Sequence, residues 1–144
     1  DFSKAGYVSA HDLQLIYEEV LNNAIFHALR PDEGQAMRLG SPVPDEPFGA
    51  HEEIVVEWTV AEDCSAISIS DNRGLLSQQD VWDRFFRQTS MAGLLDTDGR
   101  GLYLAHLLSR QVAVTIAPGL RTQISVFFEP ESTGKDKVIS VRLV

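Results

Sequence analysis

The sequence has few features that would cross-link the chain or anchor it in a membrane. One cysteine in 144 residues excludes an internal disulfide and argues against a secreted, disulfide-stapled scaffold. No apolar run approaches the roughly 20 residues that a membrane span needs, and no signal peptide is visible. We therefore expect a cytoplasmic domain without membrane contact. Because the first residue is Asp1 rather than methionine, we also expect it to be excised from a longer protein.

Basic residues are scarce as well. The chain has 12 Lys and Arg against 21 Asp and Glu, a net charge of −9, whereas binding to nucleic acid requires a basic surface. We therefore expect no nucleic-acid partner. Residues 31–53 hold six acids, one arginine and four of the six prolines, which indicates an acidic Pro/Gly-rich inserted loop within a single domain, residues 1–144. Residues 76–110 are neutral, so the acidity does not exclude a phosphate ligand.

The hydrophobic periodicity predicts helices and strands in a defined order. We expect helices at residues 9–29, 78–87 and 101–110, and strands at 54–60, 66–70, 111–117, 122–130 and 137–143. The first two strands form a hairpin that places Asp71 at a strand end, and the last three form a meander. This order predicts an α+β fold, a two-layer α/β sandwich with one mixed, mostly antiparallel sheet and helices on one face.

Three polar residues are spaced one helical turn apart in the first predicted helix. Glu19, Asn23 and His27 span about 80° of the helix and border its apolar face. One interpretation is a carboxylate that accepts a proton beside an amide oxygen that binds Mg²⁺. The other is the polar flank of an amphipathic helix, and the helix alone favours that simpler interpretation.

A second group of residues follows the second predicted strand. Asp71 stands at the strand end and Gly74 follows three residues later. A carboxylate in that position can accept a hydrogen bond from a ligand amine such as the exocyclic amine of adenine, and a glycine beside it lets a flat ring approach. An Asx turn that ends the strand explains the same residues.

A third group opens the last predicted helix. Gly99, Arg100, Gly101 and Leu102 follow a loop of small and polar residues. Free N–H groups and the positive end of the helix dipole bind phosphate at such a start, and Arg100 can add a charge-assisted hydrogen bond. A tight turn from loop to helix is the alternative interpretation.

Together, these groups resemble, in order, the motifs of the GHKL superfamily, which includes gyrase B, histidine kinases, heat-shock chaperones and anti-sigma-factor kinases. Residues 19–27 resemble its N-box, 71–74 its first glycine box, 81–87 the F-box of histidine kinases, 99–105 its second glycine box and 119–122 its last glycine-threonine element.

The resemblance implies the Bergerat fold, with ATP and Mg²⁺ as ligands. In that family scheme Asn23 ligates Mg²⁺, Glu19 orients or deprotonates the attacking water or hydroxyl, and Asp71 binds the adenine amine with support from Thr122. The phosphates are held at the second glycine box, and residues 88–98 form the lid. The implied nucleotide-binding set is Asn23, His27, Asp71, Gly74, Gly99, Arg100, Gly101, Leu102 and Thr122.

Two departures from the family pattern affect this scheme. The usual Asp-x-Gly-x-Gly has Arg73 and Leu75 at its glycine positions, so Gly74 must take the glycine role in a shifted turn. Many relatives carry a basic residue where this chain has Phe26. The charge of the phosphates would then be balanced by Mg²⁺ and arginines.

Three functions fit the pattern. The first is an ATP-dependent Ser/Thr protein kinase of a bacterial partner-switching system, acting with a sigma factor or an anti-sigma antagonist. Glu19, four residues before Asn23, and the Gly-Arg-Gly-Leu of residues 99–102 most resemble the anti-sigma-factor kinases. The second is the catalytic ATP-binding domain of a sensor histidine kinase whose partner is a response regulator, which the F-box-like stretch favours. The third is a degenerate, non-catalytic protein-binding module. Phe127 and Phe128 place rings on both faces of a strand, which suggests a possible homodimer contact.

Overall fold

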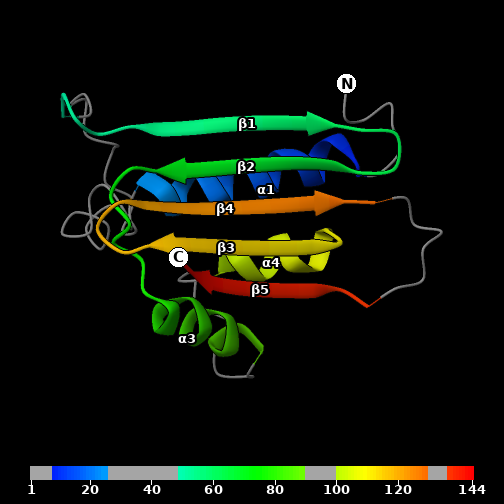
Figure 1. Ribbon diagram of the computed structural model, residues 1–144. Helices are drawn as coiled ribbons and strands as arrows, with labels where there is room; N and C mark the ends of the chain where they lie inside the picture. The colour runs from blue at the N-terminus through cyan, green and yellow to red at the C-terminus, as the bar shows by residue number, and fades with distance from the viewer. Residues whose placement is uncertain (1–7, 26–48, 90–99, 130–135) are drawn as a thin grey trace.

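The computed structural model describes residues 8–25, 49–89, 100–129 and 136–144. These residues form one sheet with two helices packed on one of its faces and a third beside the edge of the sheet (Figure 1), which confirms the predicted α+β, two-layer arrangement. None of their helices is long and apolar enough to cross a membrane. The elements, in chain order, are α1 (Ala10–Asn23), β1 (Ile54–Val60), β2 (Ser65–Asp71), α3 (Gln78–Thr89), α4 (Arg100–Leu108), β3 (Gln111–Ala117), β4 (Arg121–Phe128) and β5 (Val138–Leu143).

The five strands lie in the order β1-β2-β4-β3-β5. The pairs β1–β2, β2–β4 and β3–β4 are antiparallel, whereas β5 runs parallel to β3. The predicted meander is therefore wrong, because β2 and β3 already occupy both edges of β4. Arg110, directly before β3, contacts both neighbours of that strand. Its N–H donates to the carbonyl of Phe127 in β4, and its carbonyl accepts from the N–H of Val138 in β5.

Side chains alternate along the strands, so that one face of the sheet is apolar and packs against the helices, and the other face is polar. In β3, every second residue is buried, and these residues pack into the core together with Ile67 and Ile69 of β2 and with Ile124, Val126 and Phe128 of β4. The opposite face carries small polar side chains, such as the hydroxyls of Ser68 and Ser125, which are 2.7 Å apart. The fully buried core includes Ile16, Val20, Ile67, Ile69, Val81, Val112, Val114, Ile116, Val126 and Phe128.

Helix α1 begins as its sequence predicts. The hydroxyl of Ser9 accepts a hydrogen bond from the N–H of Asp12 at 3.0 Å, which satisfies one of the free donors of the first turn. The helix is described as far as Ile25, so the predicted continuation to residue 29 lies outside the described residues, as do residues 31–48 of the acidic loop. On the described part, Ile16 and Val20 pack into the core.

We expect the imidazole of His106 to make the free energy of unfolding depend on pH. It lies on α4 against the ring of Phe85, with ring centroids 5.3 Å apart. Burial, followed by the charge of Lys137, lowers the pKa of His106 below its usual value. The unfolded chain therefore binds the proton more readily, and the free energy of unfolding should fall as the pH drops from 7.5 to 5.5.

Urea denaturation at several pH values checks this expectation. His106→Gln should flatten the dependence of unfolding on pH between 7.5 and 5.5, whereas the exposed-site control His11→Gln should keep the wild-type slope. An unchanged slope in His106→Gln would remove this imidazole from the account.

Candidate functional site

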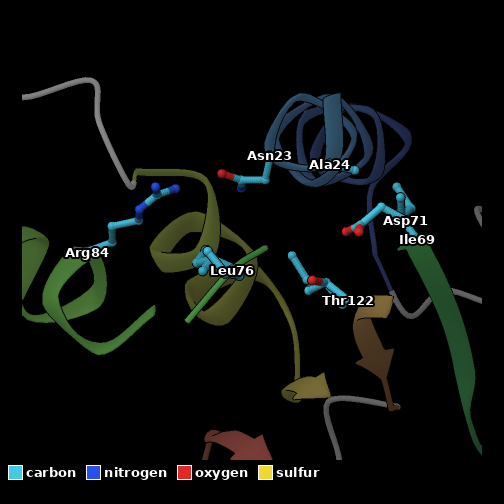
Figure 2. Close-up of a pocket in the computed structure, with 9 residues that line it drawn as sticks. Asn23, Ala24, Ile69, Asp71, Leu76, Arg84 and Thr122 are labelled. Carbon is cyan, nitrogen blue, oxygen red and sulfur yellow. The ribbon is translucent and has the colours of Figure 1, made fainter. Parts of the chain in front are cut away.

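A pocket opens at the end of the sheet where β2 ends and β4 begins. It lies between the sheet and the helices, and residues from both layers converge on it (Figure 2). In Figure 1 the C-terminal end of α1 and the N-terminal end of α4 both point toward this end of the sheet. The residues that line the pocket are Asn23, Ala24, Ile69, Asp71, Leu76, Arg84, Leu102, Thr122 and Ile124.

Asp71 and Thr122 face each other on adjacent strands beside this pocket. They are register partners in the β2–β4 pair, and each is only 4% exposed. Oδ1 of Asp71 accepts hydrogen bonds from the N–H groups of Arg73 at 2.9 Å and Gly74 at 3.0 Å. The Asx turn expected as the simpler interpretation is thus present, and it uses only one of the two carboxylate oxygens.

One oxygen of this pair has unused hydrogen-bonding capacity. The hydroxyl of Thr122 is buried and has no partner among the described residues. The two hydrogen bonds described for the Asp71 carboxylate both go to Oδ1. Buried polar groups are nearly always hydrogen-bonded, so this unpartnered hydroxyl opposite a carboxylate indicates a place for a polar ligand.

Gly74 serves the turn and does not line the pocket. Its φ is +59°, and a Cβ built there would lie 2.2 Å from the carbonyl oxygen of Ala117 and 2.7 Å from the backbone nitrogen of Arg121. Its own carbonyl accepts from the N–H of Gly119 at 3.1 Å. Glycine therefore lets the chain after Asp71 pass directly against the β3–β4 turn, which fixes the carboxylate beside Thr122.

The polar stripe of α1 meets the first turn of α4. A Cβ on Gly101 would lie 2.9 Å from Nδ2 of Asn23 and 2.9 Å from Oε2 of Glu19. Arg100 reaches Oε1 of Glu19 from its own guanidinium at 3.7 Å. The glycine at this position allows the close approach, so residues from two separate motifs form one cluster above the pocket. Leu102, one residue further, is 2% exposed and lines the pocket.

The described side chains of this cluster can hold a metal ion only together with a ligand that supplies further oxygen atoms. The described residues contain no group of three or more His, Cys, Asp or Glu side chains that could hold a metal ion. Mg²⁺ in nucleotide sites is bound chiefly by phosphate oxygens and water, with one or two protein oxygens. Asn23, which lines the pocket beside Glu19, fits that limited role.

The pocket is narrow in this conformation. Its volume is about 20 Å³, which is room for about one water molecule. The sheet floor is fixed by paired strands. Outside the sheet, the pocket is lined by Leu76 and Arg84, and by Asn23, Ala24 and Leu102. A flat ring needs more room than this, so lining side chains outside the sheet must move for it to enter.

The structure brings most of the predicted site residues together. Asn23, Asp71, Leu102 and Thr122 line one pocket, and Glu19, Arg100 and Gly101 lie next to Asn23. His27, Gly99 and the lid beyond Thr89 lie outside the described residues.

Sequence reasoning did not place Arg84 in this site. The residue lies within the F-box-like stretch, whose aromatic residues are its most conspicuous feature. The helical spacing could have indicated Arg84, because it places this residue beside Val81, Phe85 and Gln88, the buried residues of α3.

Comparisons with known proteins gave no match: no protein-family model, no curated protein and no solved structure matches the chain. The candidate site is therefore defined by the geometry described above.

Proposed function

We propose that this chain is an adenine-nucleotide-binding domain of the GHKL type that transfers the γ-phosphate of ATP to a Ser or Thr of a partner protein in a bacterial partner-switching system. One observation supports the binding step above all others. The hydroxyl of Thr122 is buried without a partner among the described residues, and it lies opposite Asp71, whose described hydrogen bonds both go to Oδ1.

The edge of adenine is complementary to this pair. Its exocyclic amine is a donor for the carboxylate, and the neighbouring ring nitrogen is an acceptor for a hydroxyl. Ile69, Leu102 and Ile124 provide apolar surface next to these two groups. A ring seated there would give the Thr122 hydroxyl a partner and the Asp71 carboxylate a further hydrogen bond, and these two bonds would be the source of its affinity.

Glu19 is the residue that we assign to the chemical step. Its side chain is 22% exposed and lies one helical turn before Asn23. In the transfer, the acceptor hydroxyl oxygen forms a bond to the γ-phosphorus, the bond from that phosphorus to the bridging oxygen of ADP breaks, and the hydroxyl proton passes to the Glu19 carboxylate. Mg²⁺, when bound with the nucleotide, supplies positive charge at the phosphates.

Two observations support other functions. The aromatic cluster on α3, in which Trp82 stacks on Phe86 with ring centroids 5.7 Å apart, favours the catalytic domain of a sensor histidine kinase. The narrow pocket favours a non-catalytic module that binds proteins without a nucleotide.

Calorimetric titration tests the proposal. We expect both Mg-ATP and Mg-ADP to bind with measurable heat and to raise the unfolding temperature. Absence of heat and of a thermal shift at millimolar nucleotide would contradict the proposal and favour the non-catalytic module. A partner assay then separates the two kinases, because a phosphohistidine product is acid-labile and a phosphoserine is not.

Glu19→Gln separates chemistry from binding. The amide cannot accept the proton, so the transfer of phosphate from ATP to the partner protein should fall by about 100-fold or more, while the affinity for ATP stays within a few-fold of wild type. Glu18→Gln, at an exposed neighbouring position, is the matched control and should keep wild-type activity. If folded Glu19→Gln loses ATP binding, this assignment of its role is wrong.

A further inference from the structure

We propose that Arg84 is the residue that binds the phosphate nearest the nucleoside, which makes it the anion-specificity residue of this pocket. This inference rests on the proposed function. It adds a contact from α3, on the side of the pocket away from Asp71 and Thr122.

The position of Arg84 is set by the residues around it on α3. Val81 is fully buried and Phe85 is 9% exposed, so this side of the helix is held against the protein. Phe85 also contacts the rings of Tyr103 and His106 on α4, with centroids 5.9 Å and 5.3 Å away. The backbone of Arg84 is therefore anchored, and its side chain lines the pocket.

Its side chain is directed toward the part of the pocket where a phosphate belongs. In Figure 2 the guanidinium of Arg84 extends from α3 toward the amide of Asn23, on the opposite side of the pocket from Asp71. A ligand whose amine contacts Asp71 would thus present its other end to Asn23 and Arg84.

The charges of the lining residues support the same orientation of the ligand. Among the described residues that line the pocket, Arg84 is the only cation and Asp71 the only anion. The pocket therefore fits a ligand with a hydrogen-bond donor at one end and an anion at the other, as in an adenine nucleotide. A guanidinium binds phosphate oxygens with two parallel hydrogen bonds, which an ammonium group cannot do.

Arg100 has a different place. It does not line the pocket and instead pairs with Glu19, above Asn23. The two arginines approach from different helices, so Arg84 serves the phosphates close to the nucleoside, and Arg100 lies beside the residue assigned to the chemical step.

The test compares ligands that differ in phosphate. Wild type, Arg84→Gln, Arg84→Lys and Arg87→Gln are titrated with adenosine, AMP, ADP and inorganic pyrophosphate in the absence of Mg²⁺. Arg87 is the matched control, because it is an exposed arginine three residues later on the same helix and is not among the pocket-lining residues.

We expect Arg84→Gln to weaken AMP, ADP and pyrophosphate by about tenfold or more, because it removes a charge-assisted hydrogen bond. Adenosine should change less than twofold, Arg84→Lys should recover part of the loss, and Arg87→Gln should match wild type. If Arg84→Gln weakens the affinity for adenosine and for ADP equally, Arg84 only shapes the pocket and does not select anions. Unchanged ADP affinity would also overturn the inference.

The pyrophosphate arm distinguishes the two proposals. If wild type binds pyrophosphate and loses it in Arg84→Gln but binds no adenine compound, the proposed function fails and the anion role of Arg84 stands. If wild type binds adenosine but no phosphate-bearing ligand more tightly, the anion role fails and the adenine pocket stands.

Discussion

Gly74→Ala should lower the free energy of unfolding by about 3–5 kcal/mol. Alanine is strained at the positive φ of +59°, and its Cβ would meet three backbone atoms of the β3–β4 turn within 2.8 Å. A flexible side chain can move away from such a contact, but these atoms belong to a paired turn in which the Leu120 N–H donates to the Ala117 carbonyl. Urea denaturation followed by circular dichroism measures the loss.

Gly119→Ala is the matched control. Its φ is +74°, but a Cβ there meets nothing within 4 Å. This variant should lose only about 1–2 kcal/mol, the cost of the left-handed conformation alone. Equal losses at the two glycines would show that the close approach of Gly74 to the turn contributes nothing to stability.

Asp71→Asn should weaken ATP binding by about 100-fold or more while the fold is retained. The amide oxygen of asparagine can still accept from the N–H groups of Arg73 and Gly74, so the turn survives. Its NH₂ group would occupy the place of Oδ2 and meet the adenine amine donor to donor. Calorimetry gives the affinity, and the free energy of unfolding should change by less than about 1 kcal/mol.

Asp83→Asn removes the same charge at an exposed position on α3. Its carboxylate accepts from Gln79 at 2.8 Å and does not line the pocket, so ATP affinity should stay at the wild-type value. If Asp71→Asn binds ATP as tightly as this control does, adenine does not bind at Asp71.

Local patterns predicted much of the fold. The alternating apolar residues of β3 and β4 and the cap at Ser9 are determined by neighbours in sequence, so the strands and the start of α1 agree with expectation. The position of β5 is different, because it depends on which sheet edge is free once β2 has paired with β4. No pattern within residues 137–143 contains that information.

The candidate site, too, could be predicted from the sequence only in part. Residues in recognisable motifs, such as Asn23, Asp71 and Gly101, were predictable because a spacing or a glycine marks them. That Gly101 meets Glu19 and that Thr122 lies opposite Asp71 follow from helix packing and strand register, which the sequence alone does not specify. Arg84 was missed because its side of α3 becomes meaningful only when the helix is placed against the pocket.

A crystal structure of the protein with ADP tests the central claim most directly. We expect the adenine ring between Ile69 and Leu102, with its exocyclic amine about 3 Å from Oδ2 of Asp71. Its ring nitrogen should lie within hydrogen-bond distance of the Thr122 hydroxyl, and Leu76 should be moved outward. A nucleotide bound on the other face of the sheet, in the groove that includes Glu57 and Arg121, would contradict it.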